Sequence, residues 1–204
     1  MVRSFSDDPV DPALVERLID LARRTPSAGN SQATEFLLLD TPDDVAAYWD
    51  VTLTAERRSS FGWPGLLVAP VMVVIAVRPD AYVERYAEPD KARTGLGDGQ
   101  QRWAVPYWWV DSGAVAQNLL LAVVDAGLGA CLFGLFEHEA AVAERFDVPD
   151  GWRLVATVAL GWPASERDPR PGRSEARSRP TLAEVVHRGG WVQTVNDTGG
   201  PAVP

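Results

Sequence analysis

Residues 111–133 read DSGAVAQNLLLAVVDAGLGACLF, and this stretch decides the fold. Between residues 115 and 124 almost every side chain is apolar, so a helix formed here must be covered on all sides. We expect Asp111 to cap the first turn, because a carboxylate accepts hydrogen bonds from the unpaired backbone N–H groups of a helix start. The glycines that follow are expected to end the helix, and residues 131–133 read as a strand. The stretch therefore predicts a core helix followed by a strand, and a subunit interface is one way to cover that helix.

Helical and strand patterns alternate in the rest of the chain. Leucines recur at helical spacing after an Asp-Pro start, which predicts a helix over residues 12–25, and a second helix is expected to begin at Thr41. Short apolar runs predict strands over residues 35–39, 71–77 and 152–160, and the second of these is rich in β-branched residues, as in a central strand. Because the strands are unevenly spaced and no regular βαβ repeat is present, the fold class is predicted as α+β with a helix-flanked sheet.

Composition narrows the class of protein. The chain has 204 residues, 46% of them hydrophobic, which is enough for one globular domain with a core. Its formal net charge of −9 argues against a protein that coats nucleic acid or an anionic membrane. With one cysteine and two histidines, we expect no metal site and no disulfide framework. The longest apolar run and the polar N-terminal residues predict no membrane span and no signal peptide, hence a cytoplasmic protein.

Two stretches offer polar groups to a ligand. Residues 23–32 (RRTPSAGNSQ) combine small residues, which let the backbone approach a flat ligand, with the hydrogen-bonding side chains of Ser27 and Asn30. The alternative is a plain helix-terminating turn. Residues 166–179 carry five arginines that could hold a phosphate, although a solvated tail with compensating acids is an equal alternative. A short helix is expected over residues 181–188.

Residues 91–110 (KARTGLGDGQQRWAVPYWWV) gather four large aromatic side chains in a glycine-containing segment. A short loop needs fewer aromatic residues for packing, so one hypothesis is a lid or substrate loop, and packing into the core is the alternative. The candidate substrate-binding residues are Trp103, Tyr107, Trp108 and Trp109.

Five sequence features, in order along the chain, resemble the FMN-dependent nitroreductase family. The loop at residues 26–32 matches the pattern Pro-Ser-x-x-Asn-x-Gln, and the resemblance covers residues 3–191. The other four are Arg3-Ser4-Phe5 with Pro9-Val10, the core helix with Ala126-Gly127-Leu128-Gly129, Ala159-Leu160-Gly161-Trp162-Pro163, and Arg177-Ser178-Arg179-Pro180.

The resemblance implies an α+β homodimer with a central, mostly antiparallel sheet flanked by helices and with flavin at the subunit interface. It implies an FMN-binding domain over residues 1–190, including an arginine-rich arm at 164–180, and a tail at 191–204. By position in the family's motifs, Ser27 and Asn30 line the isoalloxazine ring. Leu132, Phe133 and Gly134 face the N5 and O4 edge of the ring, and the phosphate is held by Arg3, Arg177 and Arg179.

The activity implied is an NAD(P)H-dependent FMN oxidoreductase that reduces an electron-poor acceptor, such as a nitroaromatic compound or a quinone, by a ping-pong mechanism. No protein side chain need be catalytic, since the flavin carries the hydride. Two departures from the family pattern stand out. Ala33-Thr34 stands where many members have Pro-Trp, which affects substrate preference, and Gly65-Leu66 stands where some members carry a lysine near the pyrimidine edge of the flavin. The alternatives are an oxygen-coupled flavin dehydrogenase or another specialised member, such as a flavin-fragmenting enzyme, and a non-enzymatic flavin-binding protein. The choice between NADH and NADPH and the physiological acceptor stay open.

Overall fold

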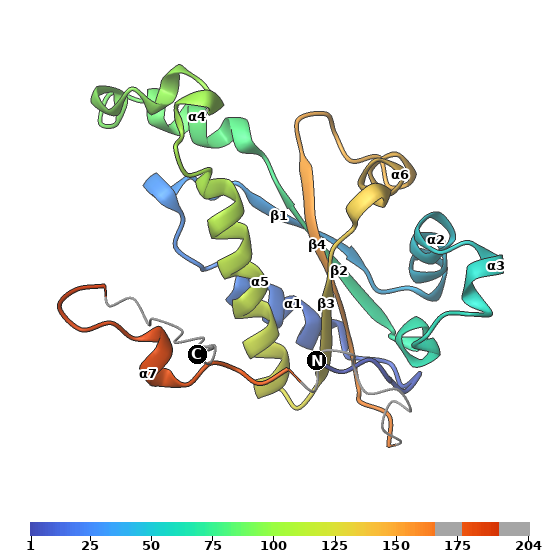
Figure 1. The fold of residues 1–204 in the computed structure, drawn as a ribbon. Coiled ribbons are helices and arrows are strands. Elements are labelled where there is room, and N and C mark those ends of the chain that lie inside the picture. The colour runs from blue at the N-terminus through green and yellow to red at the C-terminus, as the bar shows by residue number, and fades with distance from the viewer. Residues whose placement is uncertain (166–176, 192–204) are drawn as a thin grey trace, which may run out of the picture. The chain divides into compact units, whose positions relative to one another are not determined.

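The computed structural model describes residues 1–165 and 177–191, and its centre is one antiparallel sheet (Figure 1). The strands lie in the order β1-β2-β4-β3. Their bounds are Thr34–Leu39 for β1, Val71–Val77 for β2, Gly129–Phe133 for β3 and Arg153–Gly161 for β4. The α+β class and the antiparallel sheet predicted above are confirmed.

The register places β2 and β4 in the middle of the sheet. Val74 pairs with Leu37 on one side and with Thr157 on the other, and Thr157 in turn pairs with Phe133. All of β2 is buried, as expected for its run of β-branched residues. The N-terminal residues run beside β3, where the N–H of Val2 donates to the carbonyl of Ala130 at 2.9 Å. The edge strand is therefore partly covered by the chain's own first residues.

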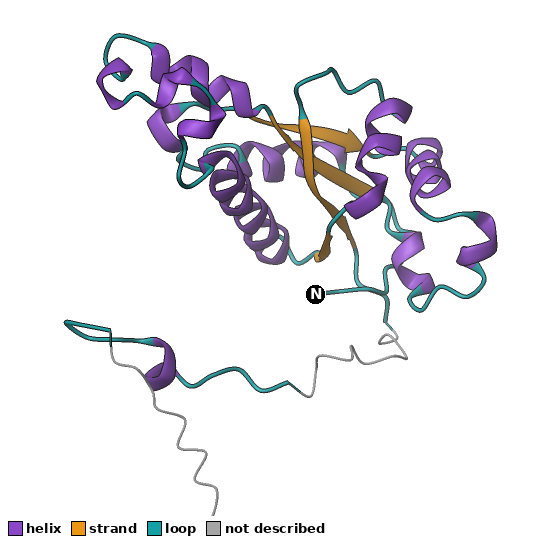
Figure 2. Ribbon diagram, turned by 45° about the horizontal axis from the view of Figure 1, so that its top comes forward, coloured by secondary structure: helices purple, strands orange, loops and turns teal. Residues whose placement is uncertain are grey.

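Helices cover both faces of the sheet (Figure 2). One face packs against α1 (Pro12–Ala22) and α5 (Tyr107–Asp125). The other packs against α2 (Pro42–Thr52) and α6 (Glu139–Arg145). Because alternate strand residues point to opposite faces, Val73 and Ile75 join the first core and Met72 and Val74 the second. The remaining helices of the described residues are α3 (Ala55–Arg58), α4 (Pro79–Ala87) and α7 (Leu182–Val185).

The core helix α5 differs from its prediction at its start. It begins at Tyr107, directly after Pro106, so Asp111 lies inside the helix and does not cap it. The side chain of Asp111 is buried and receives hydrogen bonds from other elements, which the local sequence pattern does not reveal. The predicted stop is confirmed, since Gly127 adopts the left-handed φ of +78° that favours glycine after a helix end.

One side of α5 lacks the predicted cover in this single chain. Leu121 and Val124 are 59% and 66% exposed on that side. Two other predicted helices are shorter than expected. The helix α1 ends at Ala22, where the hydroxyl of Thr25 donates to the last carbonyl at 2.7 Å, and α7 spans only Leu182–Val185.

The chain divides into two compact units, Met1–Pro169 and Arg170–Pro204, each of which is described by itself. In the described part of the second unit, Thr181 and Glu184 form a capping box at the start of α7. Most of the predicted arginine-rich arm and the tail after residue 191 lie outside the described residues, and the predicted domain boundary at 190 stays a prediction. Among the residues that are described, no helix has the length and apolar character needed to span a membrane.

Candidate functional site

A cavity of about 390 Å³ lies between the end of β3, the helix α2 and the segment 61–66. Its walls are mainly aromatic and aliphatic. The predicted residues Arg3, Leu132, Phe133 and Gly134 all line it, so the structure brings these four together. The other lining residues are Met1, Tyr48, Trp49, Thr52, Leu53, Phe61, Trp63, Leu66, Cys131, Leu135, Phe136 and His138.

Arg3 supplies the positive charge of this cavity. Its guanidinium lies over the ring of Trp63, 5.4 Å from the ring centroid. Within residues 1–165 and 177–191, no carboxylate forms an ion pair with Arg3. An unpaired guanidinium in a chain of net charge −9 is well suited to bind an anionic group.

Four aromatic residues form a continuous wall behind Arg3. Trp49 stacks on Phe133 with centroids 6.0 Å apart, and Phe61 contacts both Trp49 and Trp63. The indole N–H groups of Trp49 and Trp63 are buried, and among the described residues neither has a hydrogen-bond partner. The wall thus presents flat apolar surfaces, which suit a planar ring.

The polar side chains of the same wall stay neutral. Burial raises the pKa of Tyr48 to about 12, although its hydroxyl is hydrogen-bonded to Thr157 at 2.8 Å. Burial also raises the pKa of the Cys131 thiol, against the lowering effect of nearby Arg3. Cys131 therefore has the inert, buried position expected of a core cysteine.

The loop that contains Ser27 and Asn30 lies elsewhere, beside a smaller cavity of about 150 Å³. Ser27 and Asp111 line this cavity, together with Arg23, Thr25, Pro26, Gln32, Thr34 and Val115. The loop backbone is unusual. Gly29, Asn30 and Gln32 have φ values of +61°, +57° and +49°, in the left-handed region that non-glycine residues rarely adopt.

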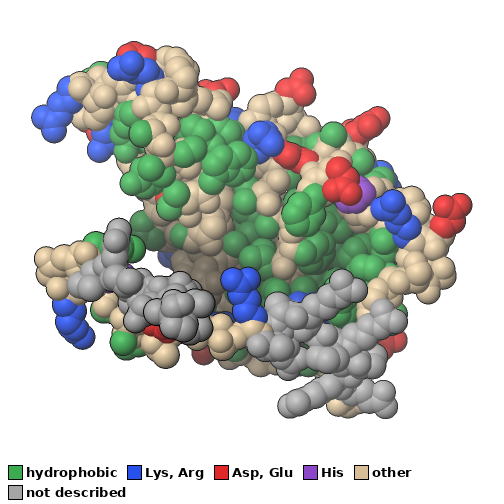
Figure 3. Space-filling model, viewed as in Figure 1, with side chains coloured by type: hydrophobic (Ala, Val, Ile, Leu, Met, Phe, Trp, Pro, Cys, Tyr) green, Lys and Arg blue, Asp and Glu red, His purple; other side chains and the backbone are tan. Residues whose placement is uncertain are grey.

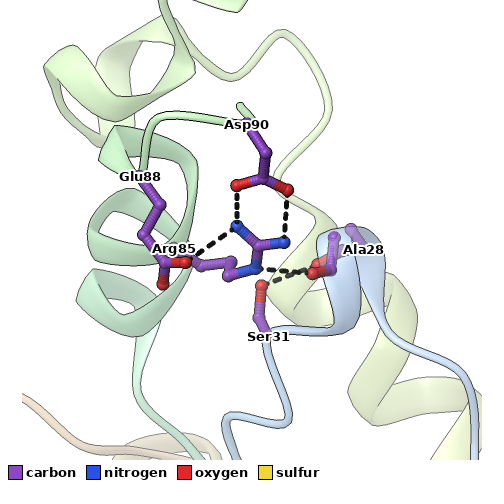
Figure 4. A network of polar contacts seen from close by, with 6 residues as sticks. Ala28, Ser31, Arg85, Glu88 and Asp90 are labelled. Carbon is purple, nitrogen blue, oxygen red and sulfur yellow. Dashed lines mark hydrogen bonds and ion pairs between the residues drawn. The ribbon is translucent and has the colours of Figure 1, made fainter. Parts of the chain in front are cut away.

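Arg85 of α4 holds this loop from one side (Figure 4). Its Nε donates to the carbonyl of Gly29 at 2.9 Å. The guanidinium is itself held by two hydrogen bonds of 2.8 Å to Asp90 and by a contact with Glu88. In Figure 4 the Arg85 side chain reaches from α4 across to the loop, with Asp90 above it.

Asp111 holds the loop from the other side. Its Oδ2 accepts hydrogen bonds from the backbone N–H of Ala28 and from the hydroxyl of Tyr82, both at 2.8 Å. Burial, with the hydrogen bond to Asp111, raises the pKa of Tyr82, so this hydroxyl remains a donor. Sequence reasoning missed the roles of Tyr82, Arg85 and Asp111 as partners of the loop. The only available signal was a carboxylate at the head of an otherwise apolar helix.

The two cavities lie on opposite faces of the sheet. The Ser27 loop is bonded to α5, which covers one face, whereas Phe133 stacks on Trp49 of α2, which covers the other. Among the described residues, none lines both cavities. Within one chain, Ser27 and Asn30 are therefore not brought together with residues 132–134.

The four aromatic residues of segment 91–110 fall into two pairs. Trp103 and Trp108 are buried in a cluster with Tyr82 and Tyr86, and the indole N–H of Trp103 donates to the carbonyl of Leu96 at 3.0 Å. Tyr107 and Trp109 are exposed, at 44% and 37%. Only the second pair is open to contact with a substrate. The cluster also abuts the Ser27 loop, because a Cβ at Gly29 would lie 2.5 Å from the ring of Tyr86.

Arg177 and Arg179 belong to the second unit of the chain and are exposed. No ion pair involves either of them in the part of the chain that the structure describes. Both remain candidates for a phosphate, as the family resemblance implies.

A larger cavity of about 440 Å³ lies beside the start of α2 and shares Trp49 with the first. Its one cationic residue, Arg58, is already neutralised by Asp50 at 2.6 Å, and Asp7 and Asp40 add negative charge. This cavity therefore suits an anionic ligand less well than the one that holds Arg3.

Comparisons with known proteins identify the family and agree with the fold. A family model described as the nitroreductase family matches residues 1–162. A protein of Archaeoglobus fulgidus provisionally named as an NADH dehydrogenase/NAD(P)H nitroreductase is 24% identical over 172 residues, 82% of each chain. A 5,6-dimethylbenzimidazole synthase of Rhodospirillum rubrum is 29% identical over 179 residues, 81% of this chain and 78% of the relative. The structure of an FMN-dependent nitroreductase from Clostridium difficile superimposes with a TM-score of 0.62 at 17% identity, covering 93% of this chain and 94% of the other.

Proposed function

The chain belongs to the nitroreductase family, and from this premise we propose that it is an FMN-dependent oxidoreductase. When bound, FMN would supply the redox chemistry by a ping-pong mechanism, taking a hydride from NADH or NADPH and delivering it to an electron-poor acceptor such as a nitroaromatic compound or a quinone. The names of two similar proteins support this class, one as an NAD(P)H nitroreductase and one as an FMN-dependent nitroreductase.

The residues around the aromatic cavity of about 390 Å³, beside the end of β3, fit a flavin nucleotide. Arg3 offers an unpaired cation for the phosphate, and the wall of Trp49, Phe61, Trp63 and Phe133 offers flat surfaces. The backbone at Phe133 and Gly134 provides hydrogen-bonding groups without side-chain bulk at Gly134. This donor set, and Arg3 above all, carries the proposal.

We assign the following roles to the chain's own residues. Arg3 neutralises the phosphate by charge-assisted hydrogen bonds, and Arg177 and Arg179 keep the phosphate-binding role that the family resemblance implies. Leu132, Phe133 and Gly134 orient the polar edge of the ring, and the apolar wall excludes water from its surface. Ser27, which lines the smaller cavity, and Asn30 of the same loop contact the ring. Tyr107 and Trp109, the exposed aromatic pair, contact the acceptor.

These roles require a second copy of the chain. The Ser27 loop and the end of β3 lie on opposite faces of one sheet, so a complete site would combine the loop of one copy with the strand end of its partner. Hydrophobic side chains gather on the face of the first unit that carries α5 and β3 (Figure 3), and Val110, Leu121 and Val124 are more than half exposed there. We propose a homodimer in which this surface is buried.

Visible absorption of the purified protein loaded with FMN tests the proposal. Anaerobic addition of NADH or NADPH is expected to remove the absorption of oxidised flavin, and later addition of a quinone to restore it. Tight FMN binding with no bleaching by either nicotinamide would instead support a non-enzymatic flavin-binding protein.

A second candidate function follows from the 29% identity to a 5,6-dimethylbenzimidazole synthase. In that case the flavin itself would be consumed. Mass spectrometry after aerobic incubation with FMN and a reductant separates the two functions. Intact flavin supports the oxidoreductase, whereas appearance of a benzimidazole supports the synthase.

A further inference from the structure

The Ser27–Gln32 loop has a backbone that the rest of the protein must hold in place. Asn30 and Gln32 are non-glycine residues with φ values of +57° and +49°, and Gly29 lies between them and Ser27 with a φ of +61°. Such conformations are sparsely populated in isolated chains and persist where surrounding contacts impose them. The contacts that impose them therefore determine whether the loop is ready for a ligand.

The deepest of these contacts is made by Asp111. It is 7% exposed, and its Oδ2 accepts both the N–H of Ala28 and the hydroxyl of the fully buried Tyr82. Asp111 comes from the middle of the first half of α5, a helix of 19 residues packed against the sheet. A rigid helix thus supplies a fixed acceptor to the loop's first residue after Ser27.

Carboxylate chemistry suits this position. One ionised oxygen accepts two donors here, and hydrogen bonds to a charged acceptor are stronger than neutral ones. A leucine of similar size would leave the N–H of Ala28 and the hydroxyl of Tyr82 buried and unpaired, which is costly. An asparagine could still accept through its amide oxygen, but without the charge.

We propose that Asp111 is a positioning residue, which fixes the Ser27–Gln32 loop in the conformation that contacts the flavin ring. The contact between this loop and the flavin ring rests on the proposed function, whereas the fixing of the loop by Asp111 does not. Arg85 is the second support, since it binds the carbonyl of Gly29. Its side chain is half-buried but its acidic partners, Glu88 and Asp90, are more than half exposed, so it is the weaker support.

Hydrogen exchange in the flavin-free protein tests the positioning role by itself. In Asp111→Leu, the Ala28 amide should exchange about 10- to 150-fold faster, the range expected for loss of a hydrogen bond to a charged group. Asp111→Asn should show a smaller acceleration. Exchange within β2 and β4 should not change. If the amides of residues 28–32 exchange at the wild-type rate in both variants, the proposal is wrong.

Glu139→Gln is the matched control. Glu139 also accepts a backbone N–H from a distant segment, that of Leu154 at 3.1 Å, but it lies away from the loop. Its substitution should leave exchange at residues 28–32 unchanged. Should Asp111→Leu fail to fold, Tyr82→Phe provides the test, because it removes one donor to the same oxygen and should speed exchange in the loop by a smaller factor.

Titration with two flavins tests the link to the ring. Asp111→Leu should weaken the binding of FMN and of riboflavin by the same factor, since the loop contacts the ring that both flavins share. It should weaken flavin binding more than it lowers kcat at saturating FMN. Selective loss of FMN binding, or unchanged affinity for both in the folded fraction, contradicts the link. If the wild type binds neither flavin, the proposed function fails, while the exchange experiment still decides the positioning role.

Discussion

The indole of Trp49 lies nearly parallel to the ring of Phe133, with centroids 6.0 Å apart and ring planes 16° apart. Trp49 belongs to α2, and Phe133 is the last residue of β3. The stack therefore joins α2 to the end of β3, next to Gly134, at the aromatic cavity. Aromatic pairs of this kind stabilise by about 0.5–1.5 kcal/mol beyond the burial of their area. The position of the strand end thus depends on a contact outside the strand.

Substitution of Trp49 separates packing from hydrogen bonding. Trp49→Ala should lower the free energy of unfolding by about 3–5 kcal/mol, because it leaves a cavity in the core. Trp49→Phe should cost much less, since it keeps a ring against Phe133 and removes a buried N–H that has no partner among the described residues. Denaturant titration measures both values. Equal losses in the two variants would mean that the indole N–H makes a needed contact.

The aromatic segment should respond differently at its buried and exposed positions. Trp103→Ala should lower the free energy of unfolding by about 3–5 kcal/mol, because Trp103 is 7% exposed within an aromatic cluster. Trp109→Ala should leave the melting temperature nearly unchanged and alter KM for bulky acceptors. Thermal melts and steady-state kinetics with a small and a large quinone make the comparison. A Trp109 variant that melts early but keeps its acceptor preference would assign this residue to the core.

Arg177 and Arg179 of the second unit should affect flavin binding only through the phosphate. Arg177→Ala and Arg179→Ala are each expected to weaken FMN binding by about 10- to 150-fold, the effect of losing a charge-assisted hydrogen bond. Riboflavin, which has no phosphate, should bind as it does to the wild type. Arg188→Ala in the same unit serves as the control. Equal weakening of both flavins would remove these residues from the phosphate site.

Glu139 gives a stability that depends on pH. Its hydrogen bond with Arg153 holds the pKa of the Glu139 carboxyl below its ordinary value of 4.5. Because the pKa is lower in the folded state, the carboxylate stabilises the protein above the unfolded-state pKa, and this stability is lost as pH falls through the folded-state pKa. The difference in melting temperature between wild type and Glu139→Gln should therefore be largest near neutral pH and vanish once the pH falls below the folded-state pKa of Glu139. The effect should be small, under about 1 kcal/mol, since Arg153 is 52% exposed. A difference that grows on acidification would contradict the assigned sign.

Elements with a strong local pattern could be predicted from the sequence. The strand β2 has the predicted bounds, Val71–Val77, because a run of β-branched residues between a proline and an Arg-Pro pair leaves little choice of structure. The loop at Ser27 and the strand end at Phe133 were also identifiable as candidate ligand contacts, the first by its polar and small residues and both by the order of the family's motifs.

What could not be predicted depends on contacts between distant segments. Asp111 has the sequence context of a helix cap, yet its partners, Ala28 and Tyr82, come from other elements. Trp49 and Trp63 form one wall with Phe133, although nothing in their local sequence points to a cavity. The separation of Trp103 and Trp108 from Tyr107 and Trp109 likewise reflects which side of the segment meets α4, and not its composition.

We propose that the aromatic cavity beside β3 holds a flavin nucleotide with its phosphate at Arg3. Isothermal titration of flavin-free wild type and Arg3→Ala with FMN and with riboflavin tests it most directly. We expect Arg3→Ala to weaken FMN binding by about 10- to 150-fold and to leave riboflavin binding unchanged, because only the phosphate loses a partner. Unchanged affinity for FMN in the variant, or an equal loss for both flavins, would contradict it.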